Sequence, residues 1–275
     1  MKYRVSVCII IVLFLGSAGC IGGEITTPGD VAEHAEMLCV LGSLQGELQD
    51  SLSCIDAGAA LAAEKLGNSG LSGEDADRIL LEAGAGPALI SAITFDRNGT
   101  VAAAAPEEAR ILIGQNIGDQ PVVKDVLSRK IPLMSSLFPL EQGGNASLIE
   151  YPVFSRDGCV IGAVSLAFSP CELVAPHAEA ATKGTGYSIM VAQPDGRILY
   201  DPDPLEVGKE TFNESLYAEF PEILEFARRY SAEWSGYSTY SFYDTGFEGI
   251  VRKEAFWTTI VMHRTEWRVI IIREL

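Results

Sequence analysis

Apolar residues recur at steps of three and four positions along the chain after residue 30. The series comprises Met37, Leu41, Leu44, Leu48, Leu52, Ile55, Ala59, Ala62 and Leu66. This spacing places them on one face of a helix, so it predicts a long amphipathic helix with one buried stripe. Asp30 is suited to cap its N-terminus and Gly67 to end it. A second helix is expected from Ser72, as its N-cap, to about Gly84.

From residue 87 onward the pattern changes to short strands and turns, and the same order occurs twice. AITFDRNGTVAAAAPEEARILIGQNI and IMVAQPDGRILYDPDPLEVGKETF both read as strand, glycine turn, strand, then a loop with proline and acidic residues. DQPVVKDVLSRK and FPEILEFARRYS are short helices, LMSSLFPLE and GYSTYSFYD are third strands, and two long strands close each copy. The chain is therefore predicted to be an α+β protein with two tandem antiparallel-sheet units, residues 87–175 and 184–275, behind residues 30–86.

The DPDP run, residues 201–204, invites a second interpretation as a metal site. Asp201, Asp203 and Glu206 carry hard oxygen ligands, but a calcium loop needs about five or more ligands and usually a glycine-centred turn. We therefore expect a loop after the second strand of the second copy. The scattered His34, His177 and His263 and the absence of a CxxC motif give no support to a metal or cofactor elsewhere.

The N-terminus has the pattern of a signal peptide at residues 1–19. Lys2 and Arg4 precede the apolar run VSVCIIIVLFL and the small residues GSAG. LGSAGC resembles a lipobox, which predicts that Cys20 carries lipid and that residues 20–29 form a tether. Plain secretion and an uncleaved anchor are the alternatives. No second apolar run is long enough to span a bilayer, so we expect a lipid-anchored protein on the extracellular face of the cell membrane with no output module of its own.

Charge and cysteine content narrow the possible partners. A formal net charge of −17 argues against nucleic acid and against an anionic membrane surface. Cys39 and Cys54 would lie too far apart on one helix to bond to each other, and Cys159 and Cys171 bracket a strand, so crossed pairs and free thiols stay open. Three sequons, at Asn98, Asn145 and Asn213, predict surface glycosylation; coincidence in polar turns is the alternative.

In their order along the chain, several motifs resemble the double Cache family of extracellular sensor domains, whose two sheets are PAS-like. They are FDRNGTV, IGQNIGDQPVVKDVLSRKIPLMSS, EYPVFSRDGCVIGAVSLAF and, in the second copy, GYSIMVAQPDGRILYDPDPLEVGK. The resemblance covers about residues 30–275. It implies a membrane-distal unit (87–175) that holds a small ligand and a membrane-proximal unit (184–275) that relays or supports. An Arg-x-Trp-Tyr run and a late aspartate, typical of members that bind amino acids or amines, are missing; Ala167 stands where the aspartate would fall, so an amine ligand is not expected.

Polar residues within apolar strands of the first copy are the candidate ligand contacts. They are Ser135, Ser136, Tyr151 and Ser165, with Arg129 or Lys130 as a cation for a carboxylate ligand. The alternatives are a solvent-facing position for each strand residue and a solvated helix end for the two cations. Asp119 is expected to cap the helix at residues 120–130 rather than to bind ligand.

The leading hypothesis is a sensor lipoprotein that binds a small organic ligand and acts through a membrane-bound signalling or transport partner. A structural or interaction lipoprotein without ligand, and a solute-binding protein that feeds a transporter, are the alternatives. The sequence has no nucleophile elbow, HExxH motif or Walker loop, so no enzyme activity is expected.

The ligand is expected in the first copy because of side-chain size. Ser135 and Ser136 leave room there, whereas Tyr237, Tyr240, Phe242 and Tyr243 of the second copy are expected to fill its interior.

Overall fold

The computed structural model describes residues 28–140, 144–244 and 249–275. The expected signal peptide and Cys20 lie outside these residues. Within the described part of the chain, no helix combines the length and the apolar character that crossing a membrane requires.

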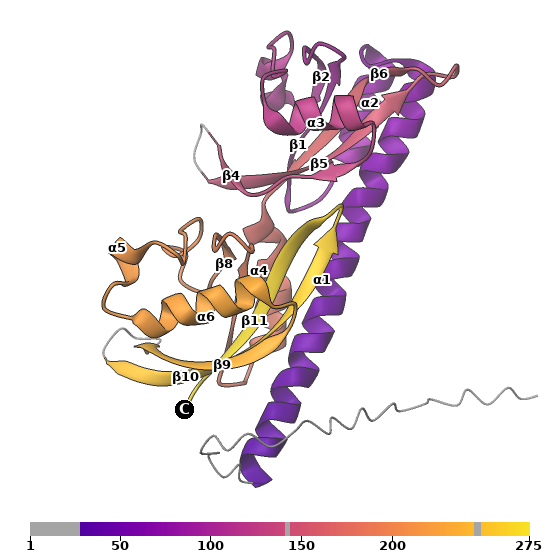
Figure 1. Cartoon of the computed structure of the whole chain (residues 1–275). Helices are drawn as coiled ribbons and strands as arrows, with labels where there is room; N and C mark the ends of the chain where they lie inside the picture. The colour runs from indigo at the N-terminus through magenta and orange to yellow at the C-terminus, as the bar shows by residue number, and fades with distance from the viewer. Residues whose placement is uncertain (1–27, 141–143, 245–248) are drawn as a thin grey trace, which may run out of the picture.

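A single long helix, α1 (Pro28–Ser69), runs along the whole molecule, and both sheets pack against it (Figure 1). The stripe predicted from the sequence is buried at every position except Ile55, which is partly buried. Two predicted boundaries are wrong, because Asp30 lies inside the first turn and the helix continues past Gly67. A Cβ at Gly67 would stand 2.2 Å from the carbonyl oxygen of Phe154, so glycine is needed there for the close approach of a strand.

The first unit is a sheet with the strand order β2-β1-β6-β5-β3, in which β4 also pairs with β5. Its elements are α2 (Glu74–Ala83), β1 (Leu89–Asp96), β2 (Val101–Ala105), the 3₁₀ helix η1 (Glu107–Leu112), α3 (Pro121–Arg129), β3 (Leu133–Met134), β4 (Phe138–Pro139), β5 (Asn145–Phe154) and β6 (Val160–Phe168). All its pairings are antiparallel.

The second unit repeats this topology with the order β8-β7-β11-β10-β9. Its elements are β7 (Tyr187–Ala192), β8 (Ile198–Tyr200), α5 (Glu214–Tyr217), α6 (Pro221–Ala232), β9 (Gly236–Tyr243), β10 (Ile250–Met262) and β11 (Thr265–Glu274), and α4 (Pro170–Thr182) joins the two units. The structure therefore confirms the predicted α+β fold with two tandem sheets behind one helix.

Two local predictions in the first unit are wrong. The expected third strand is interrupted, and Ser135 and Ser136 lie between β3 and β4. The Ser135 hydroxyl accepts the Leu148 N–H at 2.9 Å and donates to the Ser136 carbonyl at 2.8 Å, so a side chain replaces part of the strand ladder. Asp119 does not cap α3: the N-cap is Gln120, and Asp119 pairs instead with Lys124 at 3.2 Å.

Each sheet lies between α1 and a short helix of its own unit, and the two inner layers differ in size. In the first unit the cluster between sheet and α3 has four buried members, Phe95, Val123, Val126 and Ala163. The corresponding cluster around α6 in the second unit is much larger and rich in aromatic rings.

A buried ion pair fastens the N-terminal part of α1 to the second sheet. Glu254 on β10 is 1% exposed, and its carboxylate lies 2.5 Å from the Arg273 guanidinium. The same carboxylate accepts a hydrogen bond from the Tyr237 hydroxyl and lies 2.9 Å from His34 Nε2 on α1. Arg273 also pairs with Glu33 of α1. Helix and sheet thus share one network of charges.

A second buried carboxyl, Glu150 on β5, has little to neutralise it. It is 1% exposed and lies opposite Ser165 of β6, and its Oε2 has no hydrogen-bond partner among the described residues. Burial raises the pKa of Glu150 to about 7, although the hydrogen bond with Ser165 opposes the rise.

We predict that Arg273→Leu lowers the free energy of unfolding by about 3–5 kcal/mol, because it leaves the Glu254 carboxylate buried without its cation. Urea denaturation of the full chain measures this. The control is Lys65→Met, which removes the cation of the exposed pair with Glu82 and is expected to leave the midpoint unchanged. Equal midpoints for both variants and the wild type would contradict the role of the buried pair.

Glu150 predicts a pH dependence of stability. Its folded pKa of about 7 lies above the ordinary 4.5, so the unfolded chain releases this proton first as pH rises. The contribution to stability is complete below about pH 4.5 and is lost through about pH 7. Between pH 5 and 8 the free energy of unfolding of the wild type is expected to fall by on the order of 3 kcal/mol. Glu150→Gln is expected to abolish this fall. Denaturation across that range tests this. The exposed Glu64→Gln serves as control, and a wild-type profile for both variants would refute the prediction.

Candidate functional site

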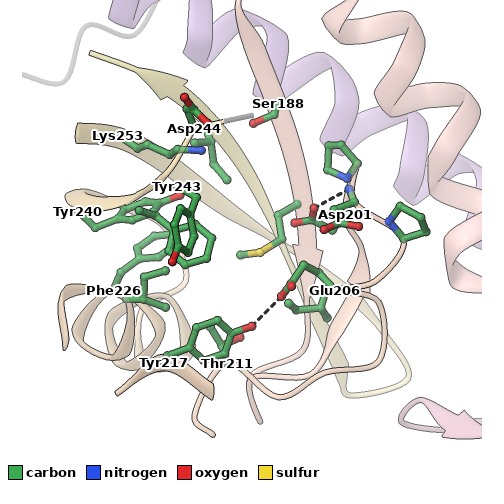
Figure 2. Close-up of a pocket in the computed structure, with 18 residues that line it drawn as sticks. Ser188, Asp201, Glu206, Thr211, Tyr217, Phe226, Tyr240, Tyr243, Asp244 and Lys253 are labelled. Carbon is green, nitrogen blue, oxygen red and sulfur yellow. Dashed lines mark hydrogen bonds between the residues drawn. The ribbon is translucent and has the colours of Figure 1, made fainter. Parts of the chain in front are cut away.

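A cavity of about 390 Å³ lies in the second unit, between the inner face of its sheet and the α5–α6 region (Figure 2). The sheet contributes alternate residues, because side chains at every second position of a strand face the same side. Ser188 and Met190 come from β7, Lys253 from β10 and Ile272 from β11. The floor of the cavity therefore combines two apolar side chains with one hydroxyl and one ammonium group.

The DPDP loop forms one wall. The N–H of Asp203 donates to Asp201 Oδ1 at 2.9 Å, and that of Leu205 donates to Asp203 Oδ1 at 2.9 Å. These side-chain turns, with two prolines that restrict the backbone, hold the loop in one conformation. Glu206 follows on the same wall and accepts a hydrogen bond of 2.7 Å from the Tyr217 hydroxyl. The expectation of a loop at these residues is confirmed.

Aromatic rings form the opposite wall, as Figure 2 shows for Tyr240, Tyr243 and Phe226. Tyr240 of β9 stacks on Phe226 of α6 with ring centroids 4.7 Å apart. Phe242 and Tyr243 lie 5.4 Å apart and both pack on Phe220. The expectation that these rings fill the second unit is therefore wrong, because they pack on one another and line a cavity instead.

Electrostatics in the cavity are dominated by Asp201. The pKa of Asp201 is raised to about 6, chiefly by burial and also by the neighbouring Glu206 and Asp203, while an Asp203 backbone N–H and Lys253 oppose the rise. Lys253 is only 12% exposed and lies 3.3 Å from Glu274. The cavity thus holds a carboxyl group that its surroundings only partly stabilise in the charged form.

The Tyr240 hydroxyl is a second polar group without compensation. Tyr240 is 4% exposed and lines the cavity, and no described residue forms a hydrogen bond with its hydroxyl. Burial raises the pKa of this phenol, so it stays protonated and is able both to donate and to accept a hydrogen bond. Because Tyr240 lines the cavity, its hydroxyl is available to water or to a ligand.

Three of the candidate residues predicted from the sequence come together in a different place, a groove of about 800 Å³ between the two units. Arg129, Ser135 and Ser136 line it from the first unit, and residues 263–265 line it from the second. Arg129 pairs with Asp125 at 3.2 Å, and the Thr265 hydroxyl donates to the Met134 carbonyl at 2.6 Å.

The structure does not bring the other two candidates to this groove. Tyr151 faces α1, where its hydroxyl donates to Asp56 at 2.8 Å, and His263 contacts the same carboxylate. Ser165 is buried beside Glu150. Lys130 ends α3 in a left-handed conformation and is exposed, as the helix-end alternative expected.

The sequence did not predict the cavity of the second unit, because the residues of each wall, taken separately, have a common structural explanation. Aromatic residues in a strand are usually core, and acidic residues after a strand are usually a solvated loop. The available signal was their combination within one repeat, namely DPDP and GYSTYSFYD in the same unit.

The remaining candidate sites from the sequence are the cysteines, a metal site and the three sequons. Cys39, Cys54, Cys159 and Cys171 are all free. Among the described residues, no group of three or more His, Cys, Asp or Glu side chains is arranged to hold a metal. Of the sequon residues, Asn98 and Asn213 are exposed and Asn145 is partly buried.

Known proteins with the same architecture are sensor domains. Residues 50–170 match the family model described as HK/GC/Chemotaxis protein-like, sensor domain. An extracellular ligand-binding receptor from Desulfohalobium retbaense is similar over 85% of this chain, with 26% identity and a TM-score of 0.69; this chain spans 39% of that protein. No curated protein matches the sequence.

Two chemoreceptor domains are similar over nearly their whole length. The ligand-binding domain of Pseudomonas fluorescens CtaA, solved with L-serine, has 13% identity and a TM-score of 0.64 and is matched over 90% of this chain and 99% of its own. That of Pseudomonas aeruginosa PctB, solved with L-Gln, has 15% identity and a TM-score of 0.61, over 86% and 89%. At these identities the likeness establishes the fold.

The lining role of Tyr240 predicts different results for two substitutions. Tyr240→Ala removes the stacked ring and is expected to lower the free energy of unfolding by about 3 kcal/mol. Tyr240→Phe keeps the ring and removes a hydroxyl without a described partner, so stability is expected to stay near that of the wild type. Urea denaturation compares the two. A loss for Tyr240→Phe as large as that for Tyr240→Ala would show that the hydroxyl is bonded within the protein.

Proposed function

We propose that this chain, which has the double Cache fold of extracellular sensor domains, binds a small organic solute in the cavity of its second unit. Binding would shift the balance between conformations of the sheet and α1, and a partner protein would respond to that shift. The proposal includes no catalytic step.

The observation that carries the proposal is the cavity itself, which the sheet, the DPDP loop and the aromatic wall surround in part. Its volume of about 390 Å³ lies within the range of small-molecule sites, and its lining combines apolar side chains with a few polar groups. Two of those groups are available to an occupant: the Asp201 carboxyl, whose charged form is destabilised by burial, and the hydroxyl of Tyr240, which lines the cavity. An interior that served only as a core would be close-packed at this point.

The location of the protein is part of the proposal. The signal peptide pattern at residues 1–19 and the lipobox-like LGSAGC support export and a lipid anchor at Cys20. The family model and the similar receptor from Desulfohalobium retbaense support a sensing role outside the cell. The anchored chain would then act through a membrane-bound signalling or transport partner.

The groove between the units is a second candidate binding site, because Arg129, Ser135 and Ser136 do line it together. Its cationic residues, Arg129 and Arg264, would suit a carboxylate ligand. The groove is broader than the cavity of the second unit, and several of its polar groups already bond to one another. We therefore place it second.

A pair of tryptophan variants distinguishes the two sites. The full chain is screened by thermal shift against amino acids, organic acids, purines and amines. We expect Ser188→Trp, which fills the cavity of the second unit, to abolish stabilisation by any solute that binds, because the ring takes the ligand's volume. Ser136→Trp in the groove is the matched control and is expected to retain it.

Two results would decide against the proposal. Loss of stabilisation only in Ser136→Trp would move the ligand to the groove, which three of the candidate residues predicted from the sequence line. Absence of stabilisation by every solute would favour a structural or interaction protein. The melting temperature of each variant without solute shows whether it is folded.

A further inference from the structure

Negative charge predominates around the cavity of the second unit. Four carboxyl groups line it, those of Asp201, Asp203, Glu206 and Asp244, against the single ammonium group of Lys253. Lys253 is already paired with Glu274, and Glu206 is paired with Lys209 at 2.8 Å. Among the described residues, neither Asp201 nor Asp203 has a cation within ion-pair distance. Asp201 and Asp203 therefore present negative charge to the cavity without an ion-pair partner from the part of the chain that the structure describes.

The aromatic wall adds an attraction for positive charge. Tyr217, Phe226, Tyr240, Phe242 and Tyr243 line the cavity from α5, α6 and β9. The face of an aromatic ring carries partial negative charge and attracts a cation within about 6 Å of its centroid. Figure 2 shows the rings of Tyr240 and Tyr243 on one side of the cavity and the carboxylates of Asp201 and Glu206 on the other. A molecule between the two walls would meet both.

From this arrangement we infer, against the expectation from the motifs of the first unit, that the cavity of the second unit takes a small organic cation, an ammonium compound with an apolar body. The inference deepens the proposed function and rests on it. The ammonium group would lie between Asp201 and the rings, and the apolar body would lie against Met190, Ile198 and Ile272. The volume of about 390 Å³ lies at the lower end of the range for ligand pockets, so the compound belongs to a small size class.

The uncompensated polar groups agree with a cation rather than with an anion or a neutral solute. An ammonium group beside Asp201 would favour the charged carboxylate, whose pKa burial now raises to about 6. The Tyr240 hydroxyl, which has no described partner, would accept a hydrogen bond from a primary ammonium N–H. A carboxylate ligand would meet like charges on the DPDP wall, and its desolvation would have no compensation there.

Matched pairs of compounds test the charge requirement directly. Choline is compared with 3,3-dimethylbutan-1-ol, which has the same shape without charge, and putrescine is compared with butane-1,4-diol. Calorimetry of the full chain is expected to show binding of at least one cation and at least tenfold weaker binding of its neutral counterpart. Succinate serves as the anion and is expected not to bind.

Variants place the cation within the cavity. Asp201→Asn keeps the shape and removes the charge, and it is expected to weaken cation binding roughly tenfold to hundredfold. Ser188→Trp is expected to abolish binding by occupying the cavity. Glu225→Gln, on the exposed side of α6, is the control and is expected to bind as the wild type does.

Failure of this inference is distinguishable from failure of the proposed function. Binding of a neutral compound or of succinate that Ser188→Trp abolishes would overturn the cation class and leave a ligand site in the second unit. Binding of a cation that neither Asp201→Asn nor Ser188→Trp affects would also overturn the inference. No binding by any cation in the panel would overturn it as well, and the wider solute screen then decides the proposed function.

Discussion

The apolar stripe of α1 is the contact on which the rest of the molecule depends. Each sheet buries one face against that helix, so neither unit has a complete core without it. Burial of large aliphatic side chains stabilises by about 1.5–3 kcal/mol each, and the stripe from Met37 to Leu66 supplies a series of them along both sheets. Glu33 and His34 of α1 contact the buried pair of Glu254 and Arg273. These charge interactions fix the position of the helix on the second sheet, because they form in one register of helix and sheet.

With one sheet face given to α1, each unit has only its other face available for a ligand. The two units use that face differently although their topology is the same. In the first unit α3 closes over a small apolar cluster around Phe95, and Glu150 is sealed in the sheet beside it. In the second unit α6 and β9 bring large rings together, and stacked rings such as Phe226 and Tyr240 support one another while a space remains beside them.

Periodicity was enough to predict the long helix, the repeat and the order of the strands, since each depends on patterns that many residues share. The boundaries at Gly67 and Asp119 were wrong because they depend on single contacts, with the Phe154 carbonyl and with Lys124. For the site, residue types alone assigned Arg129, Ser135 and Ser136 to one surface. Residue types alone wrongly predicted that the rings of β9 fill the interior of the second unit. Whether large side chains fill a space or surround it depends on how they pack on one another.

Strand β10 is long enough to extend from the cavity of the second unit to the groove between the two units. Lys253 on this strand lines the cavity, and His263 just beyond its end lines the groove beside the first unit and contacts Asp56 of α1. Ten residues of extended strand separate the two positions, about 33 Å at roughly 3.3 Å per residue. If the strand moves as a rigid rod, a tilt of about 3° at the Lys253 end displaces the His263 end by roughly 2 Å, so a change too small to open the sheet is large enough to break a hydrogen bond to the helix.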